Sequence, residues 1–290
     1  MTTSDYDFIR KLLKQRSGLT LSAEKHYLVE SRLMPIAQRR GFANLSELTH
    51  HLRIGLDEAL IVDVVEAMTT NETFFFRDRV PFEHFKSFIM PQLLAARVKT
   101  KRIRIWCAAA STGQEPYSLA MALKEMGHLL DGFRVEILAT DLSHEVLEKA
   151  KAGIYSQFEV QRGLPIQMLL KYFSQFGETW QIAPDIRVMV QFRSFNLLTD
   201  FLPLGQFDLV MCRNVLIYFD PPMKSDVLDR LSRVVATDGY LVLGSAETTV
   251  GLTQSFATMP DRRGLYVPAA AASPVMPRLA IGGTQLRSIG

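Results

Sequence analysis

The sequence predicts an α/β fold with a mostly parallel sheet, preceded by a small all-helical domain. Short β-branched runs alternate with amphipathic segments after about residue 100, which is typical of strands joined by crossover helices. The first 70 or so residues contain no β-rich run and show helical spacing instead. At 290 residues, with 48% hydrophobic and 22% charged residues, the chain can form one large or two modest globular domains.

Four helices are expected in the N-terminal part. Asp5 or Asp7 can cap a first helix that runs through Arg16 and ends at Gly18. Ser22 can open a second helix that ends at Gly41 and that Pro35 kinks or splits. Its apolar positions with helical spacing are Tyr27, Leu28, Leu33, Met34 and Ala37.

The third and fourth helices have clearer starts. Asn44 or Ser46 can cap a helix that extends to about Arg53, and Asp57 starts the next one. The predicted buried stripe of that fourth helix consists of Leu60, Ile61, Val64, Val65 and Met68.

Strands and helices alternate through the rest of the chain. The predicted strands are Ile103–Cys107, Val135–Ala139, Val188–Phe192, Phe207–Cys212, Tyr240–Leu243 and Gly264–Val267. The predicted helices between them are Glu115–Met126, Ser143–Ala152 and Pro221–Val235. Residues 269–290 are rich in Ala, Pro, Gly and Ser, which predicts a disordered tail.

Charge and composition exclude several classes of protein. The net charge of +3 is too small to imply nucleic-acid binding. No apolar run approaches ~18 residues, so we expect no membrane span, and the first residues show no apolar core or small-residue cleavage site, so we expect no secretory signal. Two cysteines cannot build a structural zinc site and suggest a reduced, cytoplasmic setting.

The segment from Arg10 to Arg53 holds nine basic and three acidic residues, a local net charge of +6. Such a surplus is compatible with a solvated helical face and with a docking surface for an acidic partner.

Polar residues follow the predicted strands where ligands bind in open α/β sheets. The first strand runs into a loop of small side chains that includes Gly113 and Glu115, which permits a close ligand or merely a tight turn. Asp141 ends the second strand, where a carboxylate can accept hydrogen bonds from a ribose diol or cap the next helix. Together the two loops favour an adenosine-containing ligand.

Other candidates lie at the later strand ends. Asn196 follows the third strand, and Arg213 and Asn214 follow the fourth between two apolar runs, where a site at the strand end explains the pair better than a place in the core. Residues 70–77 carry three phenylalanines and Arg77, which suit a lid over a flat ligand or a packed hinge between domains. Cys107 and Cys212 end apolar strands and are expected to be buried and inert.

These motifs resemble those of the bacterial chemotaxis receptor methyltransferases of the CheR type. The matching pieces are NETFFFR (71–77), WCAAASTGQEPYS (106–118), ATDLS (139–143), FNLL (195–198) and CRNVLIYFD (212–220). The combination of the STGxEPYS loop with CRNVxIYF is far more specific than a single glycine motif, and the resemblance extends over about residues 5–267.

The resemblance implies a Rossmann-like class I S-adenosylmethionine-dependent methyltransferase. It implies a helical domain at 1–70, a linker or lid at 71–99, and a donor-binding domain at 100–268 with a small β-insertion at about 173–193. The implied donor is S-adenosylmethionine, with S-adenosylhomocysteine as product and a receptor glutamate side chain as acceptor.

By position, the resemblance also implies the site residues. Asn71, Thr73 and Arg77 would lie over the methionine end of the donor and the methyl group. Glu115 would reach the donor's amino group, Asp141 its ribose, and Asn196 with Leu197 its adenine. Gly113 would allow close approach of the donor, and Arg213 and Asn214 would line the floor, leaving Arg77 and Tyr218 nearest the transferred methyl.

The chemistry fits the absence of a His or Cys catalytic group. A glutamate carboxylate has a pKa near ~4.3 and is already ionised at neutral pH, so no general base is needed. The site must instead align carboxylate, methyl and sulfur, which can supply ~7–11 kcal/mol. We expect Arg77 to position the incoming carboxylate and Tyr218 to shape the methyl pocket.

One departure concerns the partner. Relatives that clasp a receptor-tail pentapeptide carry a longer, glycine-richer loop in the β-insertion, whereas residues 173–192 here contain only Gly177. We therefore expect no dependence on a tail pentapeptide. We also expect a monomer that docks on receptors through its basic N-terminal helices. We expect no nucleic-acid partner and no membrane insertion.

Three other functions stay open at this stage. One is methylation of a small molecule or RNA, although the stacking aromatics expected for single-stranded RNA are not evident. Another is a non-catalytic module that senses S-adenosylmethionine. A nicotinamide oxidoreductase fits less well, because the pyrophosphate-binding loop is missing.

Overall fold

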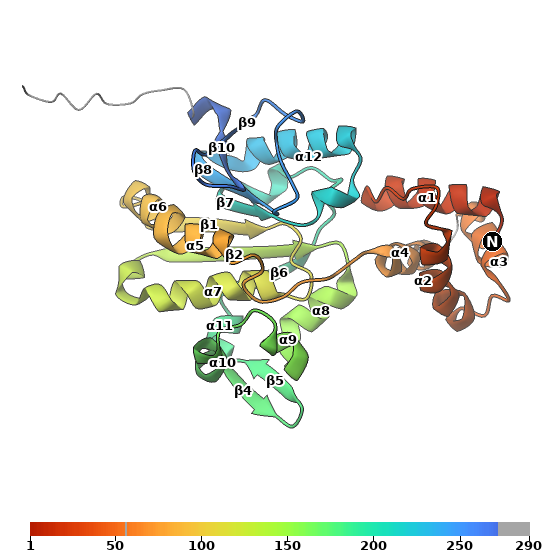
Figure 1. The fold of residues 1–290 in the computed structure, drawn as a ribbon, viewed down its shortest axis with the longest axis horizontal. Coiled ribbons are helices and arrows are strands. Elements are labelled where there is room, and N and C mark those ends of the chain that lie inside the picture. Colours follow the sequence, from red (N-terminus) through yellow and green to blue (C-terminus); the bar gives the residue numbers. More distant parts are fainter. Residues whose placement is uncertain (56, 272–290) are drawn as a thin grey trace, which may run out of the picture.

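A bundle of four helices forms the N-terminal part of the molecule (Figure 1). The whole protein is described by a computed structural model over residues 1–55 and 57–271. The helices are α1 (Thr3–Ser17), α2 (His26–Arg39), α3 (Leu45–Ile54) and α4 (Glu58–Met68). One hydrophobic cluster joins all four. The predicted stripe of α4 is confirmed, since all five of its side chains are buried; burial of such a side chain contributes about 1.5–3 kcal/mol.

The ends of these helices differ in part from expectation. Thr2 caps α1 and forms a capping box with Asp5, so Asp5 lies inside the helix rather than at its cap. Gly18 ends α1 in the left-handed conformation with φ +77°, as predicted. Asn44 and Asp57 cap α3 and α4, also as predicted.

Helix α2 corrects three expectations. It starts at His26, with Lys25 and not Ser22 at its cap, and it continues through Pro35 as one helix. Its buried stripe is Val29, Leu33, Ile36 and Ala37, whereas Tyr27 and Met34 are exposed. Leu33 and Ala37 are buried as predicted, and packing of this stripe against the bundle outweighs the loss of the hydrogen bond that proline removes.

The predicted linker over residues 71–99 contains helical structure. It holds α5 (Val80–His84), a π-helical turn (Phe85–Ile89) and α6 (Met90–Ala96). Their buried side chains belong to the same hydrophobic cluster as β1 and α7. Residues 80–96 therefore pack as part of the α/β domain.

A seven-stranded sheet forms the centre of that domain, with strand order β6-β2-β1-β7-β8-β10-β9. Its strands are β1 (Arg102–Cys107), β2 (Arg134–Asp141), β6 (Val190–Ser194), β7 (Phe207–Cys212), β8 (Val235–Leu243), β9 (Phe256–Thr258) and β10 (Leu265–Pro268). The pairs from β6 to β8 are parallel, and β10 runs antiparallel to β8 and β9. The order reverses between β1 and β7, the switch point where ligands bind in such sheets.

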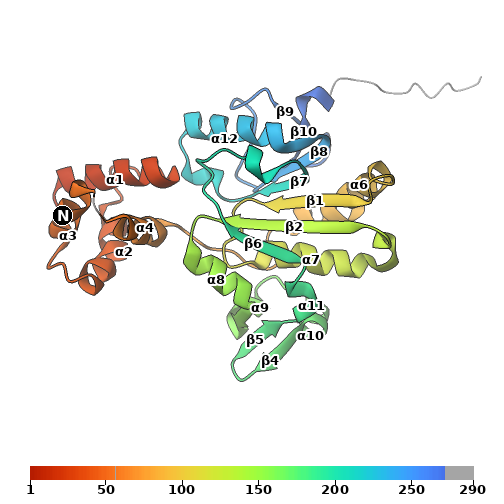
Figure 2. The same ribbon diagram turned by 180° about the vertical axis from the view of Figure 1, so that it is seen from behind.

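Helices cover both faces of the sheet (Figure 2). They are α7 (Gln114–Met126), α8 (His144–Ala152) and α12 (Pro221–Val234). Alternation along β1 sends Ile103 and Ile105 into one cluster with α7 and sends Trp106 into another with α12. Three-10 turns lie at Gly127–Leu130, Leu202–Leu204, Leu216–Tyr218 and Ala269–Ala271. The predicted α/β fold with a mostly parallel sheet is confirmed.

A second, three-stranded sheet with order β3-β5-β4 lies beside α7 and α8, at the bottom of Figure 1. It consists of β3 (Ile154–Ser156), β4 (Phe173–Phe176) and β5 (Thr179–Ile182), with α9 (Gln157–Gln161), α10 (Ile166–Tyr172) and α11 (Pro184–Arg187) around it. The predicted insertion at 173–193 is therefore displaced, because the small sheet begins at residue 154 and residues 190–193 belong to the main sheet. The predicted strand Val188–Phe192 starts two residues later, at Val190.

The predicted disordered tail over residues 269–290 is wrong for Ala269–Ala271, which form a three-10 turn, and its remainder lies outside the described residues. Within the described residues, no helix is both long and apolar enough to span a membrane.

Candidate active site

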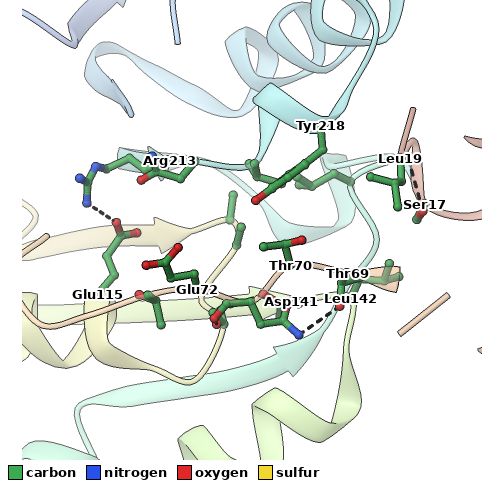
Figure 3. Close-up of a pocket in the computed structure, with 18 of the residues that line it drawn as sticks. Ser17, Leu19, Thr69, Thr70, Glu72, Glu115, Asp141, Leu142, Arg213 and Tyr218 are labelled. Atoms are coloured by element: carbon green, nitrogen blue, oxygen red, sulfur yellow. Dashed lines mark hydrogen bonds and ion pairs between the residues drawn. The ribbon is translucent and has the colours of Figure 1, made fainter. Parts of the chain in front are cut away.

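A pocket opens where the carboxyl ends of β1, β2 and β7 meet the end of α1 (Figure 3). The side chains around it come from both parts of the chain. Of the predicted site residues, those that line the pocket are Asn71, Thr73, Arg77, Glu115, Asp141, Asn196, Leu197, Arg213, Asn214 and Tyr218. The strand-end argument predicted Glu115, Asp141, Asn196, Arg213 and Asn214, and the family resemblance added the others, which extend from Asn71 to Tyr218.

Asp141 is fixed at the tip of β2 by two main-chain donors. Its Oδ2 accepts from the Ser111 N–H at 2.8 Å, and its Oδ1 accepts from the Ser143 N–H at 3.1 Å. Burial raises the pKa of the Asp141 carboxyl, and these N–H groups oppose the shift. Ser143 caps α8 itself, so Asp141 is not needed as that helix's cap. Its carboxylate instead lines the pocket.

Glu115 and Arg213 form a buried ion pair at one end of the pocket, drawn as a dashed line in Figure 3. Arg213 Nη1 donates to Glu115 Oε2 at 2.7 Å, and Nη2 donates to Asp78 Oδ2 at 2.8 Å. Burial raises the pKa of Glu115, and the Arg213 guanidinium opposes that shift. The pair therefore places a carboxylate beside the pocket with its charge largely balanced.

Arg213 also contributes an unused donor. Its Nε is buried and has no hydrogen-bond partner within the described chain. Removing a polar group from water without a partner is costly.

The segment leading from α4 to α5 lies across the pocket. The main-chain oxygen of Asn71 accepts from Ser111 Oγ at 2.7 Å, which joins this segment to the loop after β1. Arg77 donates to the Glu72 main-chain oxygen at 2.7 Å, and its guanidinium lies 5.6 Å from the centre of the Phe74 ring. Both Asn71 and Arg77 line the pocket.

The three phenylalanines of this segment do not form the lid that was one of the two expectations. Phe75 and Phe76 are buried, and none of Phe74, Phe75 or Phe76 lines the pocket. Phe75 packs edge-on against Tyr155 and Phe173, beside the small sheet. Phe75 and Phe76 therefore pack in the core of the α/β domain and not over the pocket.

Gly113 is the one predicted site residue that does not line the pocket. Its φ is +93°, and an added Cβ would lie 3.0 Å from Ala150 Cβ and 3.1 Å from the Tyr117 ring. A glycine is needed here for the turn into α7 and for its packing against α8. The part of the pocket wall that was expected to include Gly113 is formed by Ala108, Ala109 and Ser111.

Asn196 connects the two parts of the chain. Its Nδ2 donates to the Arg16 main-chain oxygen at 2.7 Å, and its Oδ1 accepts from the Leu198 N–H at 2.9 Å. Asn196 thus joins the end of α1 to the loop after β6 while it lines the pocket. Both polar atoms of the Asn196 side chain already have partners in the protein, so this side chain contributes to the pocket by fixing the shape of the wall.

The helical domain supplies a wall that sequence reasoning missed. Ser17 and Leu19, at the end of α1, line the pocket opposite the Arg213–Glu115 pair (Figure 3). Thr20 N–H donates to the Tyr218 main-chain oxygen at 2.9 Å. Thr70, Glu72, Leu142, Val215 and other lining residues were also missed. Their neighbours in sequence carried the signal for several of them, but nothing in the sequence could reveal the wall formed by α1.

Cys107 and Cys212 are buried at the ends of β1 and β7, as predicted. Burial raises the pKa of both thiols well above the usual value, which disfavours the reactive thiolate. The pocket thus offers carboxylates, a guanidinium and a tyrosine. It can bind and orient a cationic, nucleoside-like ligand.

Two family models match the chain in succession. Residues 4–69 match the all-alpha domain of CheR methyltransferases, and residues 71–265 match the CheR methyltransferase SAM-binding domain. The two matches meet close to Asn71, at the edge of the pocket.

Named relatives agree with the family models. The chain is 43% identical over 271 residues to chemotaxis protein methyltransferase 1 of Pseudomonas aeruginosa, covering 90% of this chain and 96% of that protein. It is 40% identical over 277 residues to chemotaxis protein methyltransferase Cher2 of Pseudomonas putida, covering 93% and 100%. A chemotaxis protein methyltransferase of Vibrio parahaemolyticus is 38% identical over 270 residues, covering 91% and 97%.

Proposed function

The chain belongs to the CheR family of S-adenosylmethionine-dependent chemotaxis methyltransferases, and we propose that its acceptor is the γ-carboxylate of glutamates on chemoreceptors. The observation that carries the proposal is the pocket itself, because residues from both family-matched parts line it. A receptor bound by the helical part would therefore lie close to the donor.

The residues present fit the donor. S-adenosylmethionine carries a sulfonium, an ammonium, a carboxylate and a ribose diol. Asp141 would accept from the ribose, and Glu115 would accept from the ammonium. Asn196 and Leu197 would flank the adenine, and Asn214 would form part of the floor.

Methyl transfer to a carboxylate breaks the methyl C–S bond and forms a C–O bond. The sulfonium becomes a neutral thioether, and the carboxylate becomes a methyl ester without a proton transfer. The protein must therefore exclude water and hold the three reacting atoms in line. Arg77 would orient the incoming carboxylate, with Asn71 and Thr73 beside it, and Tyr218 would shape the space around the methyl group.

Strong stabilisation of the separated charges would slow this reaction, since charge is lost as the ions combine. The guanidinium of Arg77 already contacts the Glu72 main-chain oxygen and the Phe74 ring. Arg77 would therefore orient the incoming carboxylate without stabilising its charge strongly. Arg77→Ala should therefore reduce kcat with donor binding partly kept. Unchanged turnover would remove Arg77 from the mechanism.

The local charge surplus between Arg10 and Arg53 does not by itself identify which residues of the N-terminal helices would dock on a receptor. Residues 1–70 contain nine basic and nine acidic residues, so their formal charges balance. Arg40 pairs with Asp63, Arg53 with Asp5, and Arg16 with Glu58. We propose that Lys11 and Lys25, which are exposed and make no ion pair among the described residues, provide the docking charge.

Charge reversal tests this docking surface. Lys11→Glu and Lys25→Glu should lower kcat/KM for receptor and its dependence on ionic strength, with donor affinity unchanged. Lys99→Glu is the matched control, because Lys99 is also exposed and lies near the amino end of β1. Equal losses in all three variants would exclude specific docking there.

The small sheet supports independence from a receptor-tail peptide. Only Gly177 and Glu178 separate β4 from β5, so this hairpin lacks the longer loop of peptide-clasping relatives. We propose a monomer that methylates receptors without such a tail. Calorimetric binding of a tail pentapeptide at micromolar affinity would contradict this.

Labelling with tritiated donor tests the acceptor. The purified protein, offered receptor-containing membranes from its own host, should place base-labile label on a membrane protein, as expected for a glutamate methyl ester. Base-stable label, label on RNA or a small molecule, or the absence of label would each contradict the proposed acceptor.

A further inference from the structure

Glu247 lies in the loop after β8, and its carboxylate accepts hydrogen bonds from four main-chain N–H groups. Oε2 accepts from Asn214 at 2.8 Å and from Gly244 at 2.7 Å. Oε1 accepts from Val215 at 3.0 Å and from Ile217 at 3.2 Å. No lysine or arginine forms an ion pair with Glu247 within the described chain. Three of the four donors belong to residues 214–217, directly after β7.

The backbone around this carboxylate is constrained. Asn214 has φ +59°, a left-handed conformation that asparagine adopts more readily than most residues other than glycine. A Cβ at Gly244 would lie 2.7 Å from Glu247 Oε2 and 2.9 Å from the Asn214 nitrogen. The loop after β8 and the segment after β7 therefore meet at close range, with Glu247 between them.

The segment that Glu247 holds forms part of the pocket wall. Asn214, Val215 and Tyr218 line the pocket, and Glu247 does not. Tyr218 ends the three-10 turn that begins two residues after Asn214. Glu247 can therefore affect the reaction only through the residues that it positions.

The same segment is held from the opposite side by the helical domain. Thr20 N–H donates to the Tyr218 main-chain oxygen at 2.9 Å. Lys14 pairs with Asp220. Residues 214–220 thus have N–H groups bonded to Glu247 and a carbonyl bonded to the end of α1.

We propose that Glu247 is a positioning residue for methyl transfer, which holds the Asn214–Tyr218 segment so that Tyr218 keeps its place beside the methyl group. The inference rests on the proposed role of Tyr218. In-line displacement is sensitive to alignment, and a shift of ~1 Å can cost ~100-fold in rate. A carboxylate bonded to four N–H groups holds a segment more firmly than neutral side chains could.

Glu247→Gln tests the inference with little change in volume. The amide keeps one acceptor oxygen and places an NH₂ donor against main-chain donors. We expect kcat to fall at least ~10-fold, while the Kd of S-adenosylhomocysteine, measured by calorimetry, changes by a smaller factor. Glu159→Gln is the matched control, because Glu159 also accepts a main-chain N–H, from Ser156 at 2.9 Å, but lies outside the pocket. It should leave kcat within about twofold, as expected for a surface change.

Tyr218→Ala and the double variant separate this inference from the proposed role of Tyr218. If Glu247 acts through Tyr218, Glu247→Gln should slow the Tyr218→Ala protein by no more than about twofold, because effects within one unit are not additive. Additive losses would overturn the inference, as would a Glu247→Gln protein that loses donor binding together with turnover or does not fold. If Tyr218→Ala retains full kcat, the role of Tyr218 fails and the inference fails with it; if Tyr218→Ala is slow and Glu247→Gln is not, only the inference fails.

Discussion

The two walls of the pocket are held in different ways. The wall at the strand ends is fixed by buried groups, namely the Arg213–Glu115 ion pair and the main-chain donors to Asp141. The wall from the helical domain is held by contacts nearer the surface, such as the Lys14–Asp220 ion pair and the bond from Asn196 to the Arg16 oxygen. Buried charge pairs depend strongly on both partners, whereas exposed pairs contribute little.

This difference indicates that the two walls have different roles. The strand-end wall is preformed within one domain, so it can bind each donor molecule in the same way. The helical wall depends on how two domains pack, so small changes there should alter donor affinity more than chemistry. Substitutions on the two walls can test this division.

The largest effect is expected at Arg213. Arg213→Met would leave Glu115 buried without its cation, and breaking a buried pair costs about 3–5 kcal/mol. The midpoint of urea unfolding should fall steeply, and donor binding should be lost. Lys151→Met is the control, since the Lys151–Glu148 pair is exposed. Similar stability in the two variants would contradict a preformed strand-end wall.

A smaller effect on stability but a large one on donor affinity is expected for Asp141→Asn. The amide removes one of the two acceptor oxygens that Ser111 and Ser143 use and also removes the charge. Hydrogen bonds to charged groups contribute about 1.5–3 kcal/mol, which corresponds to roughly 10–150-fold in Kd. Calorimetry with S-adenosylhomocysteine measures this change, and an unaltered Kd would exclude Asp141 from the donor site.

The helical wall is tested by a pair of glycines. Gly18→Ala would bring a Cβ to 2.9 Å from the Phe219 ring, whereas Gly41→Ala meets nothing within 4 Å. Both glycines have positive φ, so both variants should lose about 1 kcal/mol or more of stability. Only Gly18→Ala should also weaken donor binding, by several-fold. Equal donor affinity in the two variants would mean that this wall does not contribute.

Donor affinity should depend on pH through the strand-end wall. Burial raises the pKa of both Glu115 and Asp141, so their protonation begins at a higher pH than for exposed carboxyls as the pH falls. Binding a cationic donor needs the ionised forms. The Kd should therefore increase as the pH is lowered from about 7 toward about 4, and the increase should begin above the usual carboxyl range. A Kd that stays constant over this interval would contradict the roles of both residues.

The smallest effect is expected for Lys14→Ala. The Lys14–Asp220 pair is partly exposed, and such pairs contribute about 0.2–1 kcal/mol. Thermal unfolding at low and high salt should show a difference from the unaltered protein that disappears at high salt. A loss as large as that of Arg213→Met would mean that the two walls are held alike.

Sequence reasoning predicted the strand-end wall well, because parallel strands bring their carboxyl ends to one edge whatever the intervening helices. That rule alone placed Asp141, Arg213 and Asn214 near one another. It did not distinguish Gly113, which is needed for packing, from a residue that lines the pocket. Phe75 and Phe76 showed the same ambiguity, since aromatic side chains suit both a lid and a core.

The helical wall could not be predicted, because it depends on how the end of α1 packs against Tyr218 and Phe219. Periodicity identified the whole buried stripe of α4, but in α2 it identified Leu33 and Ala37 and wrongly included the exposed Tyr27 and Met34. Short strands such as β3 and β9 were missed, since three residues carry too little pattern. Glu247 gave no signal either, because its partners are main-chain N–H groups.

A crystal structure of the protein with S-adenosylhomocysteine tests most directly whether the two walls enclose the donor. We expect the ribose hydroxyls to lie within hydrogen-bond distance of Asp141, the amino group near Glu115, and the sulfur facing Tyr218 and Arg77. A nucleoside bound away from Asp141, or a sulfur atom turned away from Tyr218, would contradict the proposed site.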